Sequence, residues 1–127
     1  MALIPEHKRN VAVLGASPKP DRYSNQAIRL LANFDYRPIP VNPAFETIEG
    51  LRCFPTLAEI GEPVHTVTLY LGAPRSTPLI DEILAAKPER IIMNPGAEND
   101  ELSAAASSAG IEVVEGCTLV MLKTGLF

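Results

Sequence analysis

Short apolar runs alternate with polar stretches that contain glycine and proline along the whole chain. An apolar run of about four to eight residues that ends at a turn residue is typical of a strand buried in a parallel sheet. A run that contains two prolines predicts a short or peripheral strand instead. The predicted buried strands cover residues 11–14, 66–71, 90–93 and 111–114, and the proline-containing strand covers residues 37–41.

Between these strands the apolar residues follow helical spacing. Ser24 is the predicted N-cap of the first helix, and Asn33 is expected to close it in a left-handed conformation. Thr77, which precedes a proline, predicts the start of a second helix. Asn99 is the predicted N-cap of a third. The apolar segment 117–122 fits a helix or a strand.

Strands that alternate with helices require a parallel sheet with right-handed crossovers. We therefore expect a single α/β domain over residues 1–127, with a doubly wound, Rossmann-like sheet of about five strands and residues 11–14 at its centre. The glycine or proline that ends each strand then lies along one edge of the sheet. These residues are Gly15, Pro43, Gly72, Pro95, Gly96 and Gly116.

Composition narrows the class of protein. With 127 residues, 46% of them hydrophobic and 20% charged, the chain is long enough for one ordinary core. No apolar run approaches the roughly 20 residues of a membrane span, and residues 1–10 are too poor in apolar side chains for a signal peptide. Two cysteines, Cys53 and Cys117, imply no disulfide framework and favour the reducing cytoplasm. A net charge of −4 argues against a nucleic-acid surface.

The stretch G-A-S-P-K-P-D-R-Y-S-N after the first strand carries the clearest indication of a binding site. Its two prolines postpone the helix, so a long loop leads to the positive end of a helix dipole and its free N–H groups. Lys19 and Arg22 add cations, and Ser17 and Ser24 add hydroxyls. This combination predicts a phosphate-binding turn, whereas the alternative is that glycine here only turns the chain.

Neither of the two common nucleotide fingerprints is present. The chain has no G-x-G-x-x-G and no G-x-x-x-x-G-K-[ST]. At the end of the second strand, where NAD-binding domains hold the ribose with an acid, this chain has Asn42 and Pro43. These residues are still compatible with an anionic nucleotide that is bound without an NAD-type ribose clamp.

Five motifs occur in a fixed order: G-A-S-x-K-P-x-R-x-S-N (15–25), P-V-N-P (40–43), G-x-x-C-F-P-T-L (50–57), N-P-G (94–96) and a late Cys117. Together they resemble the small stand-alone CoA-binding proteins. These are Rossmann domains similar to the CoA-binding domain of succinyl-CoA synthetase and of NDP-forming acyl-CoA synthetases. The resemblance extends from about Asn10 to Leu122. Met93 and Asn94 depart from it, because the family commonly has an aromatic residue and a glutamine there.

The resemblance implies that coenzyme A or an acyl-CoA binds with its pyrophosphate on the first loop. It also implies an adenosine site at the end of the second strand and contacts from the later loops. The cofactor-binding residues expected on this basis, with the loop cations, are Gly15, Ala16, Ser17, Lys19, Arg22, Ser24, Asn25, Asn42, Pro43, Leu71, Gly72, Ala73, Pro74, Asn94, Pro95, Gly96 and Cys117.

No catalytic or metal-binding constellation stands out. His7 and His65 are expected at the starts of strands, at the edge opposite the proposed site. Cys117 is predicted to lie where a pantetheine thiol could reach it, and a buried structural cysteine is the alternative. We therefore expect a CoA-binding module without catalysis of its own. The competing interpretations are a component that supplies CoA to a partner synthetase subunit and a sensor that binds NAD(H).

Overall fold

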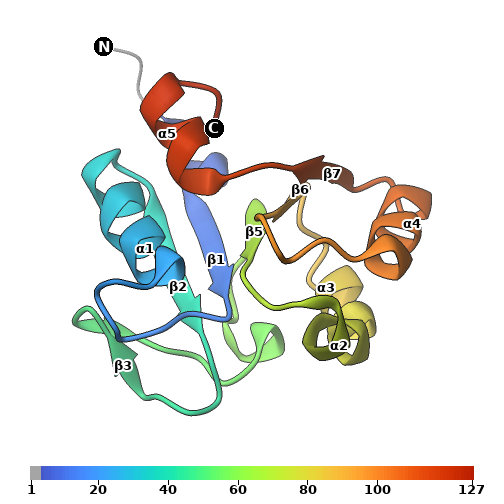
Figure 1. Cartoon of the computed structure of the whole chain (residues 1–127), viewed down its shortest axis with the longest axis horizontal. Helices are drawn as coiled ribbons and strands as arrows, with labels where there is room; N and C mark the ends of the chain where they lie inside the picture. The colour runs from blue at the N-terminus through green and yellow to red at the C-terminus, as the bar shows by residue number, and fades with distance from the viewer. Residues whose placement is uncertain (1–3) are drawn as a thin grey trace.

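The computed structural model describes residues 4–127 and contains one parallel sheet of five strands (Figure 1). Residues 1–3, the start of the segment for which no signal peptide is expected, lie outside the described residues. The spatial order of the strands is β2-β1-β5-β6-β7. They are β1 (Asn10–Leu14), β2 (Arg37–Val41), β5 (Thr66–Leu69), β6 (Arg90–Met93) and β7 (Glu112–Glu115). The predicted doubly wound, Rossmann-like α/β fold is confirmed.

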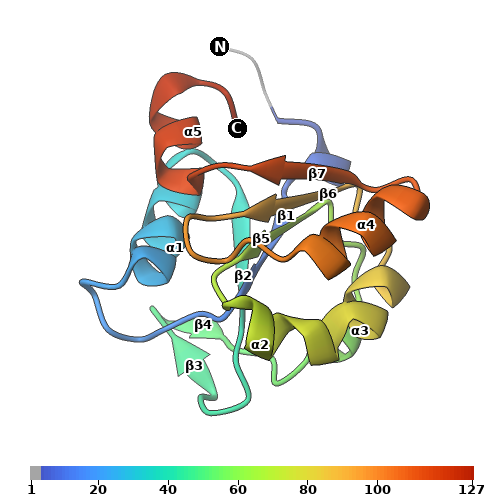
Figure 2. The same ribbon diagram turned by 45° about the vertical axis from the view of Figure 1, so that its right-hand side comes forward.

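Helices cover both faces of the sheet, with α1 and α5 on one face and α2, α3 and α4 on the other (Figures 1 and 2). Strand β1 is buried throughout, which explains its continuous apolar run. Val11 and Val13 pack in the core on the α1 side, and Ala12 and Leu14 pack in the core on the other side. The helices are α1 (Tyr23–Asn33), α2 (Ala73–Ser76), α3 (Ile80–Ala85), α4 (Asp100–Ser108) and α5 (Thr118–Thr124).

Strand β5 lies at the centre of the sheet, so the central position predicted for residues 11–14 is wrong. The chain adds β2 on one side of β1 and then crosses to β5 on the other side, and the strand order therefore reverses between β1 and β5. Both strands are fully buried, and their local sequences do not reveal which one is central. Ligands of open α/β sheets bind outside the carboxyl ends of the strands at such a reversal.

Strand β2 is the edge strand that its prolines predicted. A two-stranded hairpin follows it, made of β3 (Thr47–Ile48) and β4 (Leu51–Arg52). The turn residues Glu49 and Gly50 have φ values of 53° and 74°, as a two-residue hairpin turn of type I′ requires. This hairpin was not predicted from the sequence.

Both predicted boundaries of α1 are wrong. The helix begins at Tyr23, after Arg22, so Ser24 is its second residue and not its N-cap. Asn33 is still helical, and Asp35, with φ of 70°, adopts the left-handed conformation that was expected of Asn33. No side chain caps the start of α1, so capping residues in the sequence did not mark where it begins.

The predictions for the later helices are confirmed in part. The helix expected at Thr77 begins earlier, at Ala73, and passes through a short 3-10 turn before α3. Asn99 is confirmed as the N-cap of α4, because its side chain accepts a hydrogen bond from the Leu102 N–H at 3.0 Å. The ambiguous segment 117–122 belongs to a helix, with Cys117 as the N-cap and residues 118–122 in α5.

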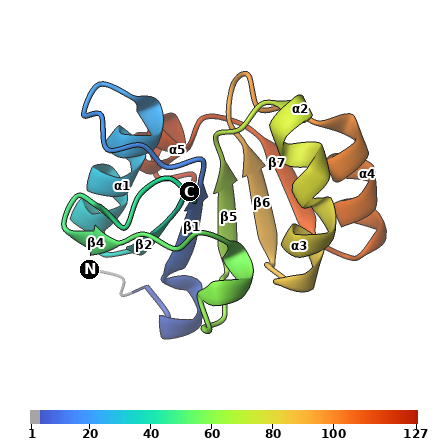
Figure 3. The same cartoon turned by 90° about the horizontal axis from the view of Figure 1, so that it is seen from below.

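The carboxyl ends of the five strands meet at one edge of the sheet. Figure 3 shows the strand arrows pointing toward the loop after β1, the start of α2 and the loop after β6. Most of the predicted site residues belong to these loops and helix starts. Across residues 4–127, every helix is too short to cross a membrane.

Candidate functional site

The loop after β1 is closed against β2 by its own backbone. The N–H groups of Gly15 and Ala16 both donate to the Val41 carbonyl, at 3.1 and 3.3 Å. Gly15 has φ of +91°, and a Cβ atom at this position would lie 2.9 Å from Leu71 Cδ2. Glycine is therefore needed for both its conformation and the close approach of Leu71. The N–H groups of these two predicted site residues are therefore already engaged within the protein.

The free backbone donors lie further along, at the start of α1. The first hydrogen bond at this end of α1 joins the Gln26 N–H to the Arg22 carbonyl at 3.0 Å. The three N–H groups at positions 23–25 precede it and point out of the helix end. Ser24, 5% exposed, holds its hydroxyl in this first turn. A helix end of this kind attracts anions.

Asn25 and Asn42 brace the loop. Asn25 is fully buried and donates to the Ser17 carbonyl at 3.0 Å and to Glu49 Oε2 at 3.1 Å, while its Oδ1 accepts from Arg29 Nε at 2.9 Å. Asn42 Nδ2 donates to the Ala16 carbonyl at 2.8 Å. These side chains fix the shape of the loop, and their polar atoms are occupied by protein partners.

A central cavity of about 350 Å³ lies between this loop, the start of α1 and the loop after β5. Eight of the predicted residues line it: Gly15, Ala16, Ser17, Arg22, Ser24, Asn42, Leu71 and Pro95. Four others were not predicted: Tyr23, Phe45, Tyr70 and Arg75. The cation at Arg75 follows a strand-ending glycine by three residues, and this spacing was the available sequence signal.

Two further cavities adjoin the central one and share residues with it. The β2-side cavity, about 270 Å³, shares Gly15, Asn42, Leu71 and Arg75 and adds a mostly apolar wall with Thr56 and Glu82. The α5-side cavity, about 430 Å³, shares Tyr23, Tyr70 and Pro95. It adds Gln26, Asn94, Cys117, Leu119, Val120 and Lys123. The three cavities thus form one groove along the carboxyl edge.

Some predicted residues are not part of the groove lining. Lys19 is exposed on the loop outside all three cavities. Gly72, Ala73 and Pro74 form the start of α2, and Arg75 is the residue of this segment that lines the groove. Gly96, with φ of 90°, turns the loop after β6 and donates its N–H to Glu98 Oε1 at 2.9 Å.

Asn94 lines the α5-side cavity, yet its side chain holds the fold together. Its Nδ2 donates to Thr68 Oγ1 at 2.8 Å and to the Leu69 carbonyl at 3.0 Å. Its Oδ1 accepts from the Thr118 N–H, the first residue of α5, at 2.9 Å. Asn94 therefore joins β5 to the start of α5 beneath the cavity floor.

Tyr70 lies at the junction of the central and α5-side cavities. Its hydroxyl is buried and lacks a hydrogen-bond partner in the described part of the chain. Burial raises the pKa of Tyr70 to about 12, and the nearby hydroxyls of Thr118 and Thr68 temper the rise. Those two hydroxyls are bonded to each other at 2.8 Å. Tyr70 therefore keeps its proton and offers a donor that has no acceptor among residues 4–127.

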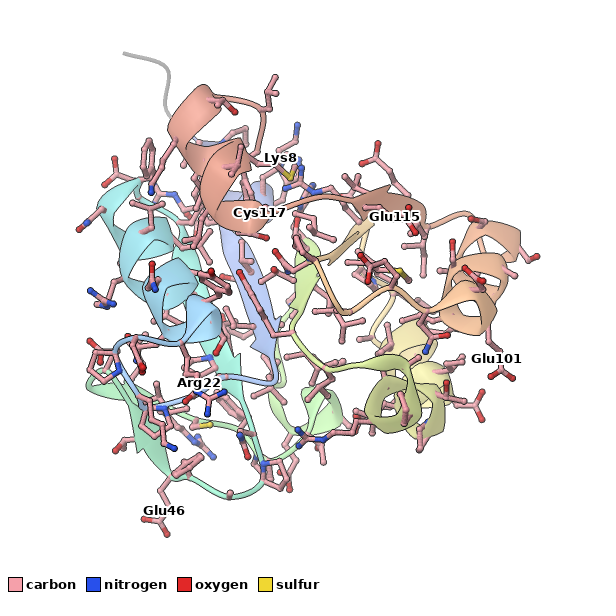
Figure 4. All side chains as sticks on the ribbon, viewed as in Figure 1. Lys8, Arg22, Glu46, Glu101, Glu115 and Cys117 are labelled. Atoms are coloured by element: carbon pink, nitrogen blue, oxygen red, sulfur yellow. The ribbon has the colours of Figure 1, made fainter. Side chains whose placement is uncertain are left out.

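The two cysteines differ in surroundings. Cys117 is the half-buried N-cap of α5 and lines the α5-side cavity (Figure 4). Cys53 is buried in the core, and burial raises the pKa of its thiol. Figure 4 shows Arg22 and Cys117 well apart, one on the loop before α1 and the other at the start of α5. Within residues 4–127, no group of His, Cys, Asp and Glu is arranged to hold a metal ion.

A doubly wound sheet with a groove at its point of strand reversal defines a Rossmann-like α/β domain. Residues 9–123 match the model of the CoA-binding domain family, and the chain belongs to this family. The predicted family resemblance is confirmed.

Two sequence relatives and one solved structure are similar to this chain to different extents. Uncharacterised protein YneT of Bacillus subtilis (strain 168) is 26% identical over 96 residues, which are 76% of this chain and 71% of that protein. Acetate–CoA ligase (ADP-forming) I of Archaeoglobus fulgidus is 29% identical over 102 residues, which are 80% of this chain but 14% of the ligase. A crystal structure of an uncharacterised protein has a TM-score of 0.89 and 38% identity, and the match covers 94% of this chain and 98% of that one. The chain is thus related to one domain of an acyl-CoA synthetase.

Proposed function

We propose that this protein binds coenzyme A or an acyl-CoA in an extended conformation along the groove. The observation that carries the proposal is the sharing of lining residues among three cavities, with the anion-binding features in the middle one. Coenzyme A has the same order of parts: an adenosine, a central pyrophosphate and a long pantetheine arm. A single linear ligand of this chemistry therefore fits the whole groove.

The pyrophosphate occupies the central cavity. It faces the free N–H groups at the start of α1, the Ser24 hydroxyl and the Arg22 guanidinium. Helix N-termini and arginine are both favourable partners for phosphate oxygens. The braced loop keeps these donors in place before the ligand arrives, which reduces the entropy lost on binding.

The adenine lies in the β2-side cavity and the pantetheine arm in the α5-side cavity. The first has the apolar wall that a purine ring prefers, with Leu14, Val41 and Pro55 among its lining residues. The second runs toward Cys117 and combines apolar side chains with Gln26 and the Tyr70 hydroxyl. Those polar groups suit the amides of a pantetheine arm, and Leu119 and Val120 suit its methylenes or a short acyl chain.

A nicotinamide dinucleotide is the competing ligand. Its recognition normally relies on an acid at the end of the second strand, where this chain has Asn42 with its amide donated to the loop. Glu82 is the carboxylate that lines the β2-side cavity, and it comes from α3. We therefore expect NAD to compete poorly with CoA.

A second candidate role is the supply of CoA to a partner synthetase subunit. The relation to a segment of the Archaeoglobus ligase supports it, because that segment is one part of a much longer enzyme. Genomic adjacency to a synthetase subunit, together with co-purification of the two chains, would favour this role over an independent binding module.

The test is calorimetric titration of the purified protein with CoA, acetyl-CoA and NAD, combined with native mass spectrometry of any retained ligand. We expect saturable binding of CoA or acetyl-CoA and weaker binding of NAD. Tighter binding of NAD than of CoA would overturn the proposed function.

A further inference from the structure

We propose that Arg75 binds the 3′-phosphate of CoA, so that the site selects 3′-phosphorylated CoA over dephospho-CoA and other adenosine diphosphates. This inference rests on the proposed function. Arg75 was not among the residues that the sequence indicated, and its role follows from its place in the groove.

The position of Arg75 matches the position of the 3′-phosphate along the ligand. Arg75 lines both the central and the β2-side cavity. With the pyrophosphate in the first cavity and the adenine in the second, the ribose lies where the two meet. The 3′-phosphate is attached to that ribose, and Arg75 is the cation that lines both cavities at this junction.

The guanidinium of Arg75 is available. Among residues 4–127 the ion pairs involve Arg9, Arg37 and His65, and Arg75 is exposed without one. Other cations near the groove are differently placed. Arg29 is bonded to Asn25 and to the Pro20 carbonyl, and the Arg52 guanidinium stacks over the Phe54 ring at 4.5 Å.

The backbone that carries Arg75 is held firmly. The Arg75 N–H donates to the Gly72 carbonyl at 2.9 Å. The next residue, Ser76, is fully buried, and its Oγ accepts from Asn99 Nδ2 at 2.7 Å. These bonds tie α2 to the start of α4, so the arginine projects from a fixed support.

Glu82 gives the β2-side cavity a second charge, of opposite sign. Its carboxylate is an acceptor suited to the exocyclic amine of adenine, but it repels a phosphate. Without the Arg75 cation the cavity therefore disfavours a 3′-phosphate. Removal of Arg75 should then abolish the preference for CoA and leave the affinity for dephospho-CoA unchanged.

The test compares CoA with dephospho-CoA by calorimetry on the wild type, Arg75→Gln, Arg75→Lys and a control, Arg37→Gln at the far edge of the sheet. We expect the wild type to prefer CoA by about ten-fold or more, since charge-assisted bonds of this kind correspond to roughly 10–100-fold in affinity. Arg75→Gln should bind CoA no more tightly than dephospho-CoA, Arg75→Lys should retain part of the preference, and Arg37→Gln should match the wild type. Unchanged melting temperatures should show that the variants fold.

Three other results have distinct meanings. Equal affinity of the wild type for CoA and dephospho-CoA would overturn the inference while the proposed function stands. An equal loss of both ligands in Arg75→Gln would also overturn it, and would assign Arg75 to the pyrophosphate instead. Absence of binding of either ligand to the wild type would refute the proposed function itself.

Discussion

The two edges of the sheet contain the same kinds of charged residue but use them differently. At the amino edge several charged side chains are paired with one another. Arg37 contacts Glu6 at 3.3 Å and Glu62 at 3.5 Å. His65 Nε2 lies 3.1 Å from Glu89. The ion pairs found within residues 4–127, those of Arg9 and Arg37, are at this edge, and the His65 contact becomes an ion pair when the imidazole is protonated.

At the carboxyl edge Arg22 and Arg75 line a cavity, and neither has an acidic partner within ion-pair distance among the described residues. Within the same residues the backbone donors at the start of α1 have no acceptor, whereas Asn25 and Asn42 beside them are fully engaged. Whether a charged side chain has a partner within the protein therefore distinguishes support of the fold from anion binding more clearly than the residue type does. Charges that satisfy one another support the fold, and charges left beside free donors indicate an anion site.

The largest expected effect comes from a substitution that unfolds the sheet and so destroys both of its edges. Leu14 is 3% exposed and lies in β1 between β2 and β5. Leu14→Asp buries an unpaired charge at a cost on the order of several kcal/mol, comparable with the stability of a small domain. We expect an unfolded or aggregated protein by circular dichroism and thermal melting.

A matched control is Leu126→Asp, since Leu126 is 73% exposed and should tolerate the change. A Leu14→Asp protein that melts cooperatively at the wild-type temperature would show that β1 does not form the buried interior of the sheet.

The next effect is an all-or-none difference between the two cysteines. With CoA disulfide, the Cys117 thiolate should attack one sulfur, form a mixed disulfide and release CoA thiol. Cys53 should not react, because it is buried and burial raises the pKa of its thiol. Peptide mapping by mass spectrometry on the wild type, Cys117→Ser and Cys53→Ser gives the measurement. Equal labelling of both cysteines, or of neither, contradicts the expectation.

The comparison of edges is sharpened by two arginine variants. Arg22→Ala removes a charge-assisted contact worth about 1.5–3 kcal/mol, which predicts a loss of roughly 10–100-fold in CoA affinity. Arg37→Ala breaks exposed ion pairs, worth about 0–1 kcal/mol of stability, and should leave CoA affinity unchanged. Calorimetry measures the CoA affinity of both variants. Added salt should reduce the difference in affinity between the wild type and Arg22→Ala. An unchanged affinity in Arg22→Ala would remove this residue from the site.

The parts of this fold that the sequence predicted well are those determined by local burial. The strands β1 and β6 are buried apolar runs, and Asn99 caps α4 with its own side chain. The start of α1 was predicted wrongly because no side chain caps it there. Which strand is central depends on the crossover after β2, and this is a property of the whole chain.

The sequence predicted which loops form the site. It did not predict which of their residues line the groove and which support the fold. Asn25 and Asn94 are polar residues in matching motifs, and the structure commits their side chains to internal bonds. Tyr70 and Arg75 were missed, although Arg75 follows the strand-ending Gly72 by three residues, because their position beside the loop after β1 depends on tertiary packing. Short motifs therefore located the groove, and its geometry is needed to separate ligand contacts from supports.

A smaller effect is expected from the Tyr70 hydroxyl. An unsatisfied buried polar group costs stability, and a neutral hydrogen bond to a ligand contributes about 1 kcal/mol. Tyr70→Phe should therefore keep or raise the melting temperature of the free protein while CoA affinity falls by roughly five-fold. Thermal melting measures the change in stability, and calorimetry on the same sample measures the change in CoA affinity. A variant that is less stable and binds CoA as the wild type does would show that the hydroxyl serves the fold.

The smallest effect concerns His65, at the amino edge and 14% exposed. Burial lowers the pKa of His65, with Glu89 opposing and Arg90, Lys8 and His7 adding to the fall. The folded pKa is thus below the unfolded value of about 6.5, and the unfolded chain takes up the proton first. Stability should therefore decline as pH falls through about 6.5 and level off below the folded pKa. Urea unfolding from pH 8 to 5 should show this slope in the wild type and a flatter one in His65→Gln, with the same CoA affinity in both at each pH. An identical slope in the variant would exclude His65, and a pH-dependent difference in CoA affinity would show that the two edges are coupled.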